Sequence, residues 1–120
     1  MKIKLASINL EVADPQRSKR FYTEALGMTE NERRSHAPGF VYLESEAGDL
    51  TLATPQEATS AEPSRTMEIG FEVDDLSALQ KRFAEQGVTG FQSQMMGWGD
   101  VIEGHDPDGH RVIVYCFTRE

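Results

Sequence analysis

At 120 residues, the chain is long enough for one ordinary domain core and too short for two independent ones. It is 38% hydrophobic and 27% charged, which is typical of a soluble globular protein and excludes a disordered or fibrous one. The net charge of −8 argues against nucleic-acid binding, and it leaves open whether the acidic residues serve solubility or attract a cationic ligand.

No apolar run approaches the ~20 residues of a membrane-spanning helix. Residues 1–5 lack the apolar core of a signal peptide. The single cysteine, Cys116, has no second cysteine with which to form an internal disulfide. We therefore expect a cytoplasmic protein with no membrane partner.

The first part of the chain predicts a strand, a helix and three further strands. A strand is expected at residues 3–12, because Ser7 to Val12 alternate polar and apolar side chains, the period of a strand with one buried face. Asp14 and Pro15 predict a helix start, because aspartate caps free N–H groups and proline suits the first helical position. The helix is expected to run from Pro15 to about Leu26 and to end at Gly27. Turn residues separate three shorter strands, expected at residues 28–33, 40–44 and 50–54.

The second part repeats this order after a linker. Residues 55–65 are rich in Ala, Ser, Thr, Glu and Pro, which predicts a surface connection. A strand is expected at residues 66–73, followed by a helix that begins after Asp75 and ends at Gly87. Further strands are expected at residues 90–94, 100–105 and 111–117.

A short internal repeat relates the two parts. The segment from Ile8 to Asp14 recurs as Ile69 to Asp75, with apolar, acidic and turn residues at matching places. We predict one α+β domain over residues 1–120, built from two paired βαβββ modules at about 1–55 and 66–120. The helices should cover one sheet face, and the other faces should form a curled mixed sheet around a shared pocket.

Several motifs agree in order and spacing with one known family. They are Val12-x-Asp14, Ser18-x-x-Phe21-Tyr22, Leu26-Gly27-Met28, Phe71-Glu72-Val73-Asp74-Asp75-Leu76, Trp98-Gly99 and Asp106-Pro107-Asp108-Gly109-His110. The chain resembles the vicinal oxygen chelate superfamily, the glyoxalase/bleomycin-resistance/dioxygenase fold. The resemblance implies a small organic ligand and a homodimer. Because the superfamily includes lyases, isomerases, dioxygenases and antibiotic binders without catalysis, it does not imply one reaction.

The resemblance also implies where a divalent metal would be held. Carried over by motif, the ligand positions fall on Ser7, Thr51, Glu68 and Ile113. A hydroxyl is a poor ligand for such an ion and isoleucine is none, so we predict that the family's metal is absent. The alternative is a metal held by displaced ligands. His105 and His110 are candidates, although we interpret both as polar turn residues.

Without the metal, the expected interior is a ligand pocket of mixed character. Its predicted residues are Ser7, Asn9, Phe40, Tyr42, Thr51, Glu68, Trp98, Ile113 and Tyr115. A buried carboxylate needs a partner, so Glu68 should meet either an Arg or Lys side chain or a cationic or hydroxylated ligand. The alternative is an open pocket in which Glu68 is simply hydrated. We therefore predict a protein that binds an organic ligand without a metal, and a cationic ligand is one option. The alternative is a glyoxalase- or dioxygenase-type enzyme, with displaced metal ligands or with Glu68 as general base.

Overall fold

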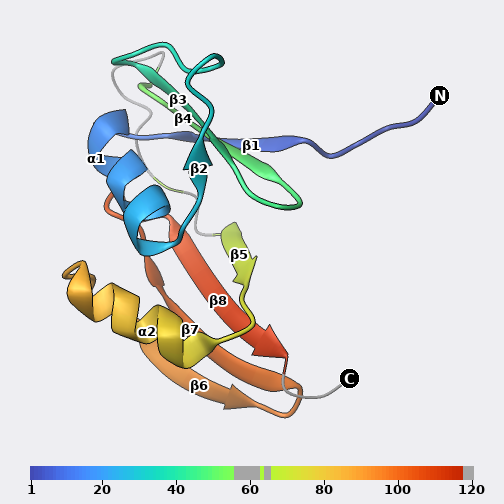
Figure 1. Ribbon diagram of the computed structural model, residues 1–120, viewed down its shortest axis with the longest axis vertical. Coiled ribbons are helices and arrows are strands. Elements are labelled where there is room, and N and C mark those ends of the chain that lie inside the picture. The colour runs from blue at the N-terminus through green and yellow to red at the C-terminus, as the bar shows by residue number, and fades with distance from the viewer. Residues whose placement is uncertain (56–62, 64–65, 118–120) are drawn as a thin grey trace. The chain divides into compact units, whose positions relative to one another are not determined.

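The structure, a computed structural model, describes residues 1–55, 63 and 66–117 (Figure 1). The chain forms two compact units, residues 1–62 and 63–120. Each unit has the element order βαβββ, with one four-stranded sheet that contains both parallel and antiparallel pairs. The predicted α+β class is confirmed.

The first sheet has the strand order β1-β4-β3-β2. These strands are β1 (Ser7–Glu11), β2 (Thr29–Glu30), β3 (Phe40–Glu44) and β4 (Asp49–Ala53). β1 runs parallel to β4, and the other neighbours are antiparallel. Helix α1 (Pro15–Arg20) continues directly into a π-helix, η1 (Phe21–Ala25), and α1 packs against β3 and β4.

The start and the end of this helical segment follow from its sequence. The Asp14 carboxylate accepts the N–H of Gln16 at 3.0 Å, and Pro15 occupies the first turn. The Leu26 N–H donates to the Phe21 carbonyl at 3.2 Å, the wider spacing of a π-turn. Gly27 then adopts a φ of 83° that favours glycine. The helix therefore lies where it was predicted, with its last turn wound more widely.

The second sheet has the order β5-β8-β7-β6. Its strands are β5 (Glu68–Glu72), β6 (Gln92–Met96), β7 (Gly99–His105) and β8 (Arg111–Phe117). Helix α2 (Leu76–Glu85) is capped by the Asp75 carboxylate, which accepts the Ala78 N–H at 3.0 Å, and α2 packs against β8. Leu79 and Phe83 of α2 are buried.

In each unit, alternate strand residues form a buried apolar face. In the first sheet these residues are Leu10, Val41, Leu43, Leu50 and Leu52; in the second they are Ile69, Ile102, Val112 and Val114. Burying a side chain of this size contributes about 1.5–3 kcal/mol, so these faces supply much of the stability of each unit. The opposite faces carry most of the residues that the sequence assigns to a ligand pocket.

In the first unit, two strands are shorter than the sequence predicted. The strand expected at 3–12 covers only Ser7–Glu11, because its partner β4 begins at Asp49, which pairs with Ser7. The strand expected at 28–33 covers only Thr29–Glu30. It stops because the Asn31 side chain accepts the Arg34 N–H at 3.1 Å and turns the backbone.

Other boundaries differ by one or two residues. Phe40–Glu44 and Arg111–Phe117 are confirmed as predicted. The strand expected at 90–94 lies at Gln92–Met96, since Gly90 has a φ of 88° that extended residues do not adopt. The predicted linker falls mostly outside the described residues. No helix in the described part of the chain is long and apolar enough to cross a membrane.

Candidate functional site

The face of the second sheet opposite α2 carries polar, charged and aromatic side chains. We call it the open face. Because side chains alternate along a strand, it is defined by every second residue and by their partners in the register. These residues are Glu68, Gly70 and Glu72 of β5, Arg111, Ile113, Tyr115 and Phe117 of β8, Val101, Glu103 and His105 of β7, and Gln92, Gln94 and Met96 of β6.

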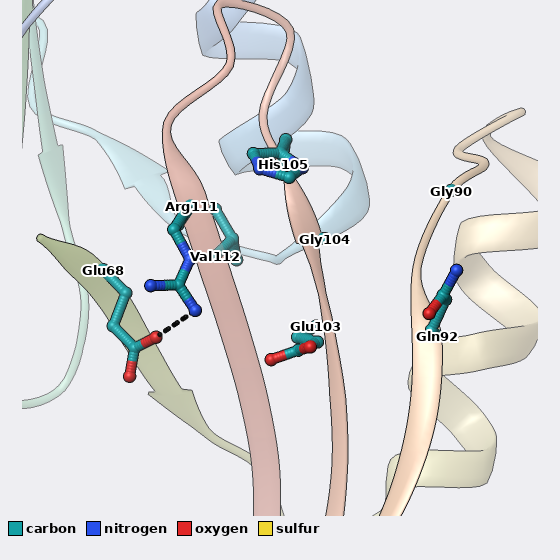
Figure 2. A pocket seen from close by; sticks show the side chains of 8 residues that line it. All are labelled: Glu68, Gly90, Gln92, Glu103, Gly104, His105, Arg111 and Val112. Carbon is teal, nitrogen blue, oxygen red and sulfur yellow. Dashed lines mark ion pairs between the residues drawn. The ribbon is translucent and has the colours of Figure 1, made fainter. Parts of the chain in front are cut away.

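Glu68 is paired with an arginine on this face. It lies directly opposite Arg111 in the β5–β8 register, and the Arg111 Nη2 atom is 3.2 Å from the Glu68 Oε2 atom (Figure 2). Both side chains are nearly half exposed, at 44% and 45%. An ion pair this open to water stabilises the fold by about 0–1 kcal/mol, so its main effect is on local charge. Of the alternatives that the sequence left open for Glu68, the structure supplies the basic side chain, and it also leaves the carboxylate partly exposed to water.

A pocket of about 200 Å³ lies beside this ion pair. It is lined by Glu68, Gly90, Gln92, Glu103, Gly104, His105, Arg111 and Val112 (Figure 2). The Glu103 carboxylate accepts the Gln94 amide at 3.2 Å. No basic side chain in the described ranges lies within ion-pair distance of Glu103. Because Arg111 pairs with Glu68, Glu103 is the carboxylate of this pocket that has no ion-pair partner among the described residues.

Three aromatic rings cluster farther along the same sheet. Trp98 lies 5.8 Å from Tyr115 and 5.4 Å from Phe117, and Tyr115 lies 5.3 Å from Phe117, measured between ring centroids. Trp98 and Phe117 remain 42% and 51% exposed. The Tyr115 ring lies beside Gly70, where an added Cβ would be 3.3 Å from its Cε1 atom. This aromatic cluster, Trp98, Tyr115 and Phe117, offers exposed ring surface next to the charged pocket.

The spacing between the pocket and the cluster follows from β8. Arg111, Ile113 and Tyr115 are alternate residues of one strand and point to one face. Alternate residues of a strand are about 6.6 Å apart, so the Cα atoms of Arg111 and Tyr115 are separated by roughly 13 Å. Ile113 lies between them. A small organic molecule is long enough to contact both ends.

The two histidines near the Asp106 turn differ in their positions. The Asp106 carboxylate accepts the backbone N–H of His110 at 2.9 Å, which closes the turn. His105 is exposed at the end of β7 and lines the pocket. The interpretation as turn residues therefore describes His110 well, but His105 also faces the candidate site.

The first unit has its own polar row on the face opposite α1. Asn9, Thr51 and Tyr42 are aligned across β1, β4 and β3. The Thr51 hydroxyl, although nearly buried, donates to the Asn9 side-chain oxygen at 2.7 Å. Ser7 is exposed at the start of β1, and Phe40 packs against His36 with ring centroids 6.4 Å apart. The predicted pocket residues thus form one group in each unit.

Tyr42 is held from both sides. Its hydroxyl donates to the Asp49 carboxylate at 2.7 Å and accepts from the Arg34 guanidinium at 3.2 Å. The guanidinium carbon also lies 5.2 Å from the centre of the Tyr42 ring, a cation–π arrangement. The hydrogen bond to Asp49 raises the pKa of the Tyr42 phenol, with a smaller contribution from burial, and Arg34 partly offsets this. Tyr42 is therefore a hydrogen-bonded phenol, unsuited to act as a base.

The structure adds residues that the sequence did not single out. Arg111 and Glu103 share the pocket with Glu68, and Arg34 contacts Tyr42. The strands β7 and β8 were predicted from the sequence, and alternation within each strand assigns Glu103 and Arg111 only to one side of its own strand. What it did not reveal is the register that sets Arg111 opposite Glu68.

The four positions that the resemblance implies for a divalent metal do not fit one. The Thr51 hydroxyl is engaged by Asn9, Glu68 is engaged by Arg111, and Ile113 carries only hydrocarbon. Ser7 offers one neutral hydroxyl, a poor ligand. Within the residues that the structure describes, no three His, Cys, Asp or Glu side chains are grouped so that they could hold an ion.

Comparison with known proteins identifies the family. The model of the Glyoxalase/Bleomycin resistance protein/Dioxygenase superfamily matches residues 4–114. The chain belongs to this superfamily, whose fold the two βαβββ units define. No curated protein sequence matches the chain.

Solved structures with this fold include enzymes and a binding protein. A glyoxalase/dioxygenase from Nostoc punctiforme is 20% identical with a TM-score of 0.78, covering 97% of this chain and 92% of that one. Lactoylglutathione lyase from Agrobacterium tumefaciens is 17% identical with a TM-score of 0.74, covering 96% and 94%. TnmS3, an antibiotic binding protein from Streptomyces sp. CB03234, is 20% identical with a TM-score of 0.74, covering 98% and 99%. At these identities the likeness shows the fold alone.

Proposed function

We propose that this protein binds a small organic molecule that carries an aromatic part and a positive charge, without a divalent metal. The observation that carries the proposal is the open face of the second sheet. There the charged pocket around Glu103 lies on the same face as Tyr115 and Phe117 of the aromatic cluster. The likeness to an antibiotic binding protein supports a binding role within this superfamily.

The carboxylates of the open face favour a positively charged ligand. Glu68 is compensated by Arg111, so the group available to a cation is Glu103 rather than Glu68. Aromatic faces also attract cations, by about 0.5–2 kcal/mol. The net charge of −8 favours the approach of a cation over that of an anion.

The enzyme alternative uses Glu68 as a general base in a glyoxalase- or dioxygenase-type reaction. It is less well supported, because the Glu68 carboxylate is engaged by the Arg111 guanidinium. A cytoplasmic location, expected from the single cysteine, and the homodimer that the resemblance implies are also part of this proposal.

The experiment uses a matched pair of planar probes, N-methylacridinium and its uncharged parent acridine at neutral pH. Trp98 is the single tryptophan, so quenching of its fluorescence reports binding at the aromatic cluster. We expect the cation to bind more tightly than the neutral probe. Glu103→Gln should weaken binding of the cation about tenfold, the effect of about 1.4 kcal/mol, and leave the neutral probe unchanged.

Glu85→Gln is the control, since it removes one exposed carboxylate from the end of α2, away from the open face. It should bind both probes as the wild type does. Equal affinity for the two probes, or equal effects of the two substitutions, would show that Glu103 does not select a cation.

A further inference from the structure

Strand β6 forms an open edge of the second sheet. It is the outermost strand in the order β5-β8-β7-β6, and it pairs with β7 alone among the described residues (Figure 1). All five of its side chains, Gln92–Met96, are exposed. An open strand edge presents unpaired N–H and C=O groups, to which another strand can add.

This edge lacks the features that usually prevent strand addition. Residues 86–99 contain no charged side chain and no proline, in a chain that is 27% charged. Natural sheets commonly protect an edge with lysine, proline or a bulge. The register of β6 with β7 runs without interruption from Gln92 to Met96, so no bulge twists the edge away.

Apolar side chains are exposed on both faces of the edge. Met95 is 89% exposed and Met96 is 42% exposed. Because neighbouring residues of a strand point to opposite faces, the two methionines lie on opposite sides of the sheet. A strand added beside β6 would cover part of both.

We propose that β6 pairs with β6 of a second copy of this chain, antiparallel and around a two-fold axis. Two copies with a net charge of −8 repel each other, and the edge at 86–99, a stretch without charged side chains, lets them approach with little opposition of like charges. A strand that pairs antiparallel with its own copy is self-complementary. The inference rests on the proposed homodimer and assigns its interface; it does not depend on the proposed ligand.

The hydrogen bonds of such an interface can be assigned to particular residues. A two-residue turn at 97–98 joins β6 to β7, so Met96 and Gly99 form the first hydrogen-bonded pair, and such pairs alternate along the ladder. Ser93 and Met95 therefore turn their N–H and C=O groups away from β7. These groups would bond to the second copy.

The test measures the mass of the full chain by sedimentation equilibrium over a range of concentrations. We expect a dimer for the wild type. Met95→Lys should raise its dissociation constant at least about tenfold, because the two-fold axis brings the two lysines close together. The substitution makes the chain less acidic, which by itself weakens the repulsion between two copies and would favour the dimer.

Two further variants isolate the edge. Met67→Lys places the same charge at a methionine that is 51% exposed outside β6, and it should leave the dimer intact. Ser93→Pro removes one outward N–H without removing a bond of the β6–β7 ladder, and it should weaken the dimer as Met95→Lys does. Circular dichroism confirms that each variant is folded.

The outcomes separate this inference from the proposed function. A monomeric wild type overturns both the interface and the homodimer. A wild-type dimer that Met95→Lys and Ser93→Pro leave unchanged overturns the β6 interface alone. Binding of the acridine probes is measured independently of either result.

Discussion

Tyr42 shows how two neighbours act on one hydroxyl in opposite senses. The Asp49 carboxylate accepts a hydrogen bond from the Tyr42 hydroxyl and favours the neutral phenol, whereas Arg34 donates to the same oxygen and favours the phenolate. Asp49 has the larger effect, so the pKa of Tyr42 lies above its ordinary value of 10.0. The consequence for folding appears only in alkaline solution.

Asp49→Asn is therefore expected to lower the pKa of the Tyr42 phenol. An amide is a weaker acceptor than a carboxylate and does not repel the phenolate. The measurement is an alkaline absorbance titration of wild type and of Tyr42→Phe, whose difference isolates Tyr42, repeated in the Asp49→Asn background. An unchanged difference curve would contradict the role of Asp49.

The same pKa shift predicts how stability depends on pH. Because the folded-state pKa is raised, the stabilisation from the Tyr42–Asp49 bond is fully present below about pH 10 and is lost as the pH rises through the raised value. The stability difference between wild type and Tyr42→Phe should therefore stay constant from about pH 6 to 9, well below that range. Thermal unfolding of both proteins measures it. A difference that disappears near neutral pH would contradict the assignment.

At the scale of elements, a strand glycine lets α2 and the second sheet pack. Phe91 precedes β6 and contacts Phe83 of α2, with ring centroids 4.9 Å apart. Its ring also lies over Gly104 of β7, where an added Cβ would be 2.7 Å from the ring atoms. The missing side chain at Gly104 therefore makes room for Phe91 on the buried face.

Gly104→Ala is expected to destabilise the protein by about 1–3 kcal/mol, because the Phe91 ring must move away from its packed position. Urea unfolding measures the change. Gly48→Ala is the matched control, since a Cβ there meets no atom within 4 Å. If both variants unfold at the same urea concentration, Phe91 does not depend on Gly104 for its place.

At the scale of the whole molecule, the implied metal positions predict a protein that does not depend on a divalent ion. Purified protein should contain less than stoichiometric metal, and Ni, Zn, Mn or Fe(II) should not raise its melting temperature. An ion at 100 times its dissociation constant would stabilise the fold by about 2.7 kcal/mol, which thermal unfolding detects. One stoichiometric ion found by elemental analysis would contradict this prediction.

Local patterns in the sequence predicted much of the fold. Turn residues beside 40–44 and 111–117 predicted two strands with correct bounds, and Asp14, Asp75, Gly27 and Gly87 marked the helix ends. Strand ends were less predictable, because a strand ends where its partner ends. Ser7 begins β1 because Asp49 begins β4, although a strand was expected from Ile3.

The candidate site was predicted in part. Glu68, Ile113 and Tyr115 do lie on one face, as alternation indicated. Arg111 as the partner of Glu68, and Glu103 as a second carboxylate of the same pocket, could not be deduced. Both depend on how β5, β7 and β8 align, and no local pattern specifies that alignment.

The sequence by itself determined the two repeated modules, the family and the side chains at the positions where relatives would hold a metal. These properties depend on residue type and on spacing along the chain. The tertiary structure decided which charges cancel, which rings gather around Tyr115 and which strand edge stays open. The physical reason is that these properties arise between segments far apart in sequence, where strand register and packing, rather than neighbouring residues, set the contacts.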